Sequence, residues 1–173
     1  MAGAPVILAA FANDSGRFLD SLQQESDAIS DALRGKKDGG VIDLEVQQGA
    51  TIARLFELVG RYGNDLAMLH YGGHANGSAL DLQAPGGNAE AHGEGLAQLL
   101  GGLPNLKLVF LNGCATQGHV EQLLAQGVPA VIATSAPVED DIALQFAREF
   151  YTALADPNAS RTIDFAFARA KAL

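Results

Sequence analysis

The sequence predicts an α/β fold, a three-layer sandwich in which a mostly parallel central sheet carries helices on both faces. Apolar runs of strand length alternate along the chain with amphipathic segments that have helical spacing. Most of these runs are continuously apolar, which is typical of strands buried on both faces of a parallel sheet. Strand–helix–strand units cross over with right-handed geometry and leave helices on both sides of such a sheet.

The length and composition predict a single domain that spans residues 1–173. Of these residues 48% are hydrophobic, enough to fill a sizeable core, and no repeat, linker or low-complexity segment divides them. The last amphipathic segment runs to the final residue without a glycine stop. We therefore expect this domain to come from a longer polypeptide.

The composition also excludes several classes of partner. The net charge of −9 argues against a nucleic-acid partner, because phosphate binding needs clustered Lys and Arg. No basic residue precedes the apolar first segment, which disfavours a signal peptide, and no run approaches the roughly 20 residues of a membrane span. The single cysteine permits no internal disulfide and suits a reducing, cytoplasmic compartment. We expect neither nucleic acid nor a membrane as partner.

The first half of the chain predicts two strand–helix units. Pro5–Ala10 is the first buried strand, and the helix that follows it is expected to end at Gly35. Val41–Val46 is shorter and more polar, as a strand at the edge of a sheet would be. Thr51 is expected to cap a second helix that closes at Gly60.

The second half predicts three more strands, a small hairpin arm and four helices. The expected strands are Leu66–His70, Leu106–Leu111 and Ala130–Thr134, with Ser78–Leu82 as the hairpin arm. The expected helices are Ala89–Leu100, Gly118–Gln126, Asp140–Leu154 and Thr162–Leu173.

Two of these strands end abruptly in glycines and then present one reactive side chain each. His74 follows Gly73, and Cys114, the only cysteine in the chain, follows Gly113. The carboxyl ends of parallel strands meet at one rim of the sheet, where ligands bind, so we expect both side chains there. A thiol beside an imidazole can serve as a nucleophile and its base. The pair predicts a cysteine hydrolase.

The residues around this pair fit the same chemistry. Backbone N–H groups near Gly73 and Gly113 can stabilise an oxyanion, and the helix predicted after Cys114 would favour a thiolate. A lone buried cysteine is more often inert, but the joint placement of the two side chains favours function. We expect His70 to be a hydrogen-bonded core residue, because it lies inside an apolar run.

The two remaining histidines, His92 and His119, fall on predicted helices, and we expect them to face solvent.

Several segments of the chain resemble the CHAT-type members of the caspase-like cysteine peptidases, the clan that includes caspases, separase, gingipains and legumain. The matching segments cover roughly the second half of the chain in family order. They are Leu69–Gly77, Leu108–Gly118, Gly127–Thr134, Pro137–Asp141 and Phe146–Leu154.

The resemblance implies a caspase-like fold and a cysteine endopeptidase with a His–Cys dyad. His74 matches the family's general acid and base, and Cys114 matches its nucleophile. Gly73 and the amide of Cys114 match the backbone that stabilises the oxyanion.

The resemblance also implies where the substrate side chain binds. The stretch that begins at Ser135 matches the wall of the pocket for the residue before the scissile bond. Asp140 and Asp141 would make that pocket acidic and favour arginine or lysine there. The same two carboxylates could instead cap the following helix and complement its dipole.

Two positions depart from the family pattern. Ala75 follows His74 where the family usually has glycine, and a positive φ at this alanine would cost about 1 kcal/mol or more. Gly113 stands where alanine is common. Neither departure removes a reacting group.

Two other classes of α/β protein fit the sequence less well. Glutamine amidotransferases place the catalytic cysteine before the histidine, whereas here His74 precedes Cys114. A flavodoxin-like binder of nucleotides would need a phosphate-binding loop after the first strand, and residues 12–16 lack that pattern. The histidines and the cysteine also lack the close-spaced ligand pairs of a zinc site. We expect no cofactor and no metal.

By resemblance, we expect an effector domain of a bacterial stress or anti-phage signalling system. Such a domain would cleave a protein substrate under the control of a sensor or regulatory module, in the same chain or in a partner. The alternative is a catalytically silent caspase-like module for interaction or dimerisation, although such a module would be free to lose the His74–Cys114 pair.

Overall fold

The computed structural model of the chain describes residues 3–14, 16–158 and 162–172. Its centre is a sheet of five parallel strands in the order β2-β1-β3-β6-β7. The strands are β1 (Val6–Ala12), β2 (Asp43–Gln47), β3 (Leu66–Gly73), β6 (Leu108–Asn112) and β7 (Val131–Ala133). The predicted edge strand is β2, and it does lie at an edge.

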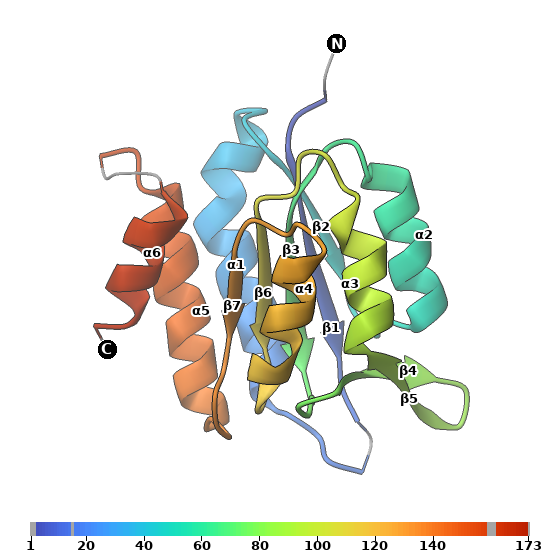
Figure 1. Ribbon diagram of the computed structural model, residues 1–173. Coiled ribbons are helices and arrows are strands. Elements are labelled where there is room, and N and C mark those ends of the chain that lie inside the picture. The colour runs from blue at the N-terminus through green and yellow to red at the C-terminus, as the bar shows by residue number, and fades with distance from the viewer. Residues whose placement is uncertain (1–2, 15, 159–161, 173) are drawn as a thin grey trace.

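Helices cover both faces of the sheet (Figure 1). One face carries α1 (Ser21–Asp38), α5 (Asp140–Ala155) and α6 (Ile163–Ala170). The other carries α2 (Ile52–Tyr62), α3 (Gly93–Gly101) and α4 (Val120–Ala125). The predicted three-layer α/β sandwich is confirmed. In the described part of the chain, no helix is both long and apolar enough to cross a membrane.

Strand β1 shows why the apolar runs of the sequence do not alternate. All of its residues are buried, because the sheet has a core on each face. Val6, Leu8 and Ala10 pack with the α2, α3 and α4 side, whereas Ile7 and Ala9 pack with the α1, α5 and α6 side. Burial on both faces makes every position of such a strand apolar.

The strand order places three carboxyl ends side by side at one rim. The chain moves outward from β1 to β2 and then returns to the other side of β1 with β3, so the order reverses at β1. The register pairs Ala12 with Gly73, and Gly72 with Asn112. The ends of β1, β3 and β6 therefore form the kind of switch point at which open α/β sheets bind ligands.

Two predicted helix ends were wrong, both at glycines. Helix α1 continues through Gly35 to Asp38, and α2 continues through Gly60 to Tyr62. Neither position requires glycine, because a Cβ there would meet no atom within 4 Å. Glycine inside a helix costs about 1 kcal/mol relative to alanine. The free energy that each helix gains by packing against the sheet outweighs this cost, and each helix ends just before its next glycine. The predicted Thr51 cap is confirmed, since its hydroxyl accepts from the Arg54 N–H at 3.1 Å.

The segment before α3 also differs from the prediction. Residues 89–92, expected to begin a helix, instead belong to β5 (Gly87–His92), which pairs with β4 (Ala79–Ala84) as an antiparallel hairpin. Gly86, at φ +85°, closes the turn between the two strands, and α3 begins only at Gly93. The hairpin lies beyond the end of β3, next to the rim (Figure 1).

Differences at the helices that follow β6 are smaller. A 3₁₀ helix, η1 (Thr116–His119), precedes α4, so the single helix expected at 118–126 was wrong. Thr162 caps α6 by accepting from the Phe165 N–H, and the helix ends at Ala170. Leu173, the expected end of this helix, lies outside the described residues.

A buried polar group joins four elements beneath the rim. The His70 ring is fully buried, with Nε2 2.8 Å from the Glu25 carboxylate of α1. Asn112 of β6 donates to the same carboxylate oxygen at 2.6 Å and to the Ala143 carbonyl of α5 at 3.1 Å. The expectation that His70 is a hydrogen-bonded core residue is confirmed. Because buried polar groups need hydrogen-bond partners, this group locks α1, β3, β6 and α5 together.

We expect His70→Ala to lower the free energy of unfolding by about 3 kcal/mol or more, since it leaves the buried Glu25 carboxylate without its imidazole partner. The measurement is urea denaturation followed by circular dichroism. His92→Ala is the matched control and should change stability by less than about 0.5 kcal/mol, because His92 is exposed. Equal losses in the two variants would contradict the structural role of the buried group.

Candidate active site

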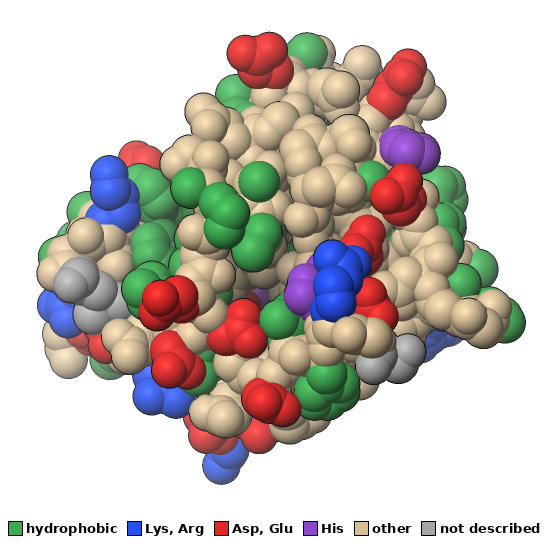
Figure 2. All heavy atoms as spheres, turned by 90° about the horizontal axis from the view of Figure 1, so that it is seen from below, with side chains coloured by type: hydrophobic (Ala, Val, Ile, Leu, Met, Phe, Trp, Pro, Cys, Tyr) green, Lys and Arg blue, Asp and Glu red, His purple; other side chains and the backbone are tan. Residues whose placement is uncertain are grey.

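The two side chains that the sequence singles out meet at the rim. His74 directly follows β3, Cys114 lies two residues past β6, and both line one cavity of about 190 Å³. The cavity lies between these strand ends and the amino-terminal parts of α1 and α5. It is lined by Leu19, Ser21, Leu22, Glu25, Gly73, His74, Asn112, Gly113, Cys114, Thr134, Val138, Asp140 and Ala143. Figure 2 shows this end of the molecule, with a histidine and a basic side chain flanked by acidic ones.

The His74 ring has a defined tautomer. Its Nε2 makes a hydrogen bond to the Arg17 carbonyl, in the loop between β1 and α1. A carbonyl oxygen can only accept, so Nε2 carries the proton and the neutral ring keeps its lone pair on Nδ1. Nδ1 is therefore the atom that can take a proton from a neighbouring thiol.

The backbone of His74 is held as well as its ring. Its carbonyl accepts from the Asp81 N–H at 3.0 Å and lies 2.6 Å from the Tyr71 hydroxyl. That hydroxyl also lies 2.7 Å from the Asp81 carbonyl, so its single proton serves both oxygens. Burial raises the pKa of Tyr71 well above its ordinary value, which keeps the phenol protonated as a donor.

Both predicted glycines lie where side chains would not fit. A Cβ on Gly73 would lie 2.5 Å from the Ala12 carbonyl oxygen and 2.6 Å from the Tyr71 hydroxyl. A Cβ on Gly113 would lie 2.6 Å from the Gly73 carbonyl oxygen. The turn that carries His74 and the turn that carries Cys114 therefore touch through bare backbone, and both glycines line the cavity.

The turn at Cys114 is sharp and strained. The half-buried thiol lies 3.9 Å from the Val138 carbonyl, and Ala115 adopts the left-handed conformation at φ 52° and ψ 37°. This costs a non-glycine residue roughly 1–2 kcal/mol. Ala115 alone shows a positive φ among the described non-glycine residues, so the strain conceivable at Ala75 does not occur. The short η1 lies between Cys114 and α4, so the α-helix begins six residues past the thiol and not directly after it.

Two threonines compensate this strain, and sequence reading missed both. The buried Thr116 hydroxyl donates to the Leu111 carbonyl at 3.1 Å and accepts from the Thr134 N–H at 2.9 Å. The Thr134 hydroxyl in turn donates to the Gly113 carbonyl. These bonds attach the cysteine turn to β6 and to the end of β7.

His119 was expected to face solvent, and this was wrong. Its ring is fully buried, and Nε2 donates to the Asn76 carbonyl at 3.0 Å. Burial lowers the pKa of His119, so the ring is neutral near pH 7. Since η1 follows Cys114 and Asn76 follows His74, this bond joins the two turns a second time.

The predicted pocket residues divide into two groups. Asp140 lines the cavity, but Ser135 and Asp141 are exposed and do not line it. Ser135 instead borders a separate, mainly apolar cavity beside β7. Asp140 and Asp141 also form the acidic first turn of α5, where they complement its dipole, but the expectation that they cap the helix was wrong, because the N-cap is Glu139 and no side chain makes a cap hydrogen bond there.

A second carboxylate in the cavity, Glu25, was not predicted. It is 2% exposed and lies on the buried side of α1 with Leu22 and Ile29. A carboxylate at such a position on an apolar helical stripe is a signal that could have identified Glu25 from the sequence.

In the described part of the chain, no group of three or more His, Cys, Asp or Glu side chains could hold a metal ion.

Comparisons with known proteins agree with the fold. The family model described as the CHAT domain matches residues 3–172, and no curated protein matches the chain. Among solved structures, the chain resembles a secreted C11 cysteine protease from Bacteroides thetaiotaomicron in complex with an irreversible peptide inhibitor, with a TM-score of 0.66 and 12% identity. The match covers 96% of this chain but 57% of that one, so the chain spans little more than half of its length. Because the family model covers nearly the whole sequence, and the structure has the caspase-like α/β fold, the chain belongs to the CHAT domain family.

Proposed function

We propose that this domain is a cysteine endopeptidase in which Cys114 is the nucleophile and His74 the general acid and base. The observation that carries the proposal is the geometry of the rim. Both side chains line one cavity, and the bond from Nε2 to the Arg17 carbonyl leaves Nδ1 of His74 free to accept a proton.

The reaction follows from these groups. Nδ1 of His74 takes the thiol proton, and the Cys114 sulfur attacks the substrate carbonyl carbon to form a tetrahedral oxyanion. We assign the stabilisation of that oxygen to backbone N–H groups at Gly73 and Cys114. The intermediate collapses to a thioester as the imidazolium protonates the leaving amine. Water, deprotonated by His74, then hydrolyses the thioester and restores the thiol.

We expect Cys114→Ala and His74→Ala each to lower peptide hydrolysis by about 1,000-fold or more. The double variant should be no worse than either single one, because nucleophile and base act as a unit. Initial rates on fluorogenic peptides measure the loss, and circular dichroism checks that the fold is kept.

Exposed His92→Ala is the matched control and should keep full activity. Full activity of Cys114→Ala in a protease-free preparation would refute the proposed nucleophile. A wild-type domain that cleaves no peptide under any activating condition would instead favour the catalytically silent interaction module.

We further propose cleavage after arginine or lysine. Two carboxylates line the cavity, the half-buried Asp140 and the buried Glu25, and none of its described lining residues is Lys or Arg. A basic substrate side chain would form charge-assisted hydrogen bonds there, whereas an aspartate would meet like charge. Asp140 is the proposed selecting group, since Asp141 and Ser135 lie outside the cavity.

We expect Asp140→Asn to lower kcat/KM for arginine and lysine peptides by about 10- to 100-fold, the worth of one charge-assisted bond. The neighbouring Asp141→Asn is the matched control and should leave kcat/KM unchanged. Fluorogenic peptides that differ only at the cleavage-site residue measure the preference.

A preference for aspartate or a large apolar residue would overturn this specificity. A basic preference that survives Asp140→Asn but is lost in Glu25→Gln would transfer the selecting role to Glu25. Since Glu25 also holds His70 and Asn112, that variant needs a parallel measurement of stability.

We place the domain in the cytoplasm, as the effector of a bacterial stress or anti-phage signalling system with a protein substrate. Membership of the CHAT family supports this role, and a lone free thiol suits a reducing compartment. A sensor module, in the same chain or in a partner, would control it.

A further inference from the structure

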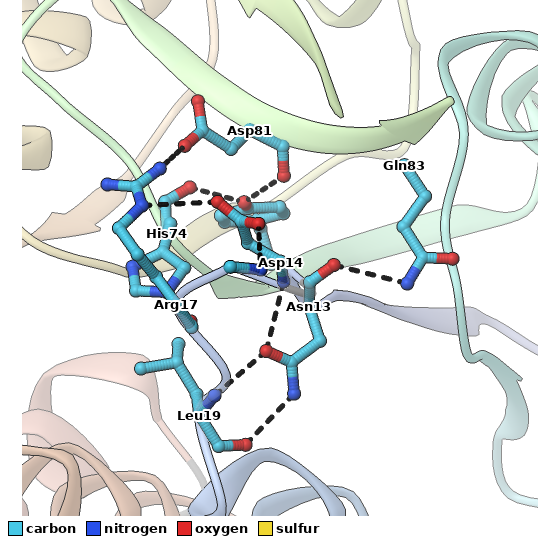
Figure 3. Close-up of polar contacts among 9 residues, drawn as sticks. Asn13, Asp14, Arg17, Leu19, His74, Asp81 and Gln83 are labelled. Carbon is cyan, nitrogen blue, oxygen red and sulfur yellow. Dashed lines mark hydrogen bonds and ion pairs between the residues drawn. The ribbon is translucent and has the colours of Figure 1, made fainter. Parts of the chain in front are cut away.

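The carbonyl that holds the His74 ring belongs to Arg17, in the loop between β1 and α1. The Arg17 side chain anchors this loop through two ion pairs. Arg17 Nη2 lies 2.8 Å from Asp81 Oδ2, and Arg17 Nε lies 3.1 Å from Asp14 Oδ2. Figure 3 shows the Arg17 side chain between these two carboxylates, with the His74 ring beside its main chain. Asp14 belongs to the same loop, but Asp81 belongs to β4 of the hairpin.

Asp81 therefore holds His74 in two ways, one direct and one through Arg17. Its backbone N–H donates to the His74 carbonyl at 3.0 Å. Its carboxylate holds Arg17, whose carbonyl accepts from Nε2 of the His74 ring. The hairpin thus fixes both the main chain and the ring of this histidine.

The internal shape of the loop depends on a different residue. The Asn13 side chain accepts from the Leu19 N–H at 2.8 Å and donates to the Leu19 carbonyl at 3.0 Å. The Gln83 amide adds a bond of 3.2 Å from β4 to the Asn13 carbonyl, at the start of the loop. Loss of the Arg17–Asp81 ion pair should therefore move the Arg17 carbonyl without unfolding the loop.

We propose that Arg17 and Asp81 are positioning residues for His74. Their ion pair holds the Arg17 carbonyl at Nε2 and so keeps Nδ1 free to accept the proton of the Cys114 thiol. This role rests on the proposed function, and it predicts an effect on rate rather than on stability. An ion pair with one exposed member contributes little to folding, whereas a small displacement of a reacting group can cost up to about 100-fold in rate.

Ionic strength gives the proposal a specific readout. The Arg17 side chain is 61% exposed, while Asp81 and Asp14 are 14% and 20% exposed, so dissolved ions reach the pair from the arginine side. Raising NaCl from about 0.05 M to about 0.5 M should lower kcat of the wild type and change that of Asp81→Asn much less.

The experiment compares Asp81→Asn, Arg17→Gln and the double variant on one fluorogenic peptide. In each single variant we expect kcat to fall about 10-fold while KM stays within about 2-fold of the wild-type value. The double variant should match the single ones, and Arg17→Lys should recover part of the lost kcat. Arg34→Gln is the matched control, because Arg34 forms an exposed ion pair on α1 with Asp31, away from the rim. Unchanged kcat in both single variants, or additive losses in the double variant, would overturn the proposal.

A second readout does not depend on catalysis. The ring ¹⁵N shifts of His74, assigned with His74→Ala, should report the Nε2–H tautomer in the wild type and a tautomer mixture in Asp81→Asn. This change supports the positioning role even if the domain cleaves no peptide, in which case only the proposed function fails. An unchanged tautomer in Asp81→Asn overturns the positioning role even in an active enzyme.

Discussion

The backbones of Gly73 and Gly113 are in contact, and the arrangement of the rim depends on that contact. A side chain at Gly113 would collide with the Gly73 carbonyl, and one at Gly73 would collide with β1. Bare backbone at both positions lets the turns after β3 and β6 close against each other. This brings an imidazole and a thiol, distant in sequence, to the same cavity. The carboxyl ends of adjacent parallel strands lie side by side at the rim where open α/β sheets bind ligands, and this is where the two turns meet.

Buried polar groups keep that approach rigid. Beneath the cavity, Glu25 binds His70 and Asn112, and beside it His119 bonds to the turn that follows His74. These bonds lie on opposite sides of the sheet, since Glu25 comes from α1 and η1 leads into α4. The strained backbone at Ala115 persists because its surroundings are over-determined in this way.

Local sequence patterns were sufficient for the sheet, both glycine turns and the His74–Cys114 pair, because each depends on an apolar run and its end. They failed where a distant contact outweighs a local rule. Residues 89–92 pair with β4 instead of forming a helix, and His119 is buried by elements far away in sequence. Glu25 was missed because a carboxylate on a helix is normally exposed. The role of Arg17 could not be predicted, since its backbone carbonyl binds His74.

The most direct test of the central claim is covalent labelling of the thiol, read by mass spectrometry of the intact protein and its peptides. A peptidyl acyloxymethylketone that ends in arginine should modify Cys114 once and completely, and His74→Ala should slow the reaction by orders of magnitude. Labelling that is absent in an activated wild-type domain, or equally fast without His74, would contradict a nucleophile activated by this histidine.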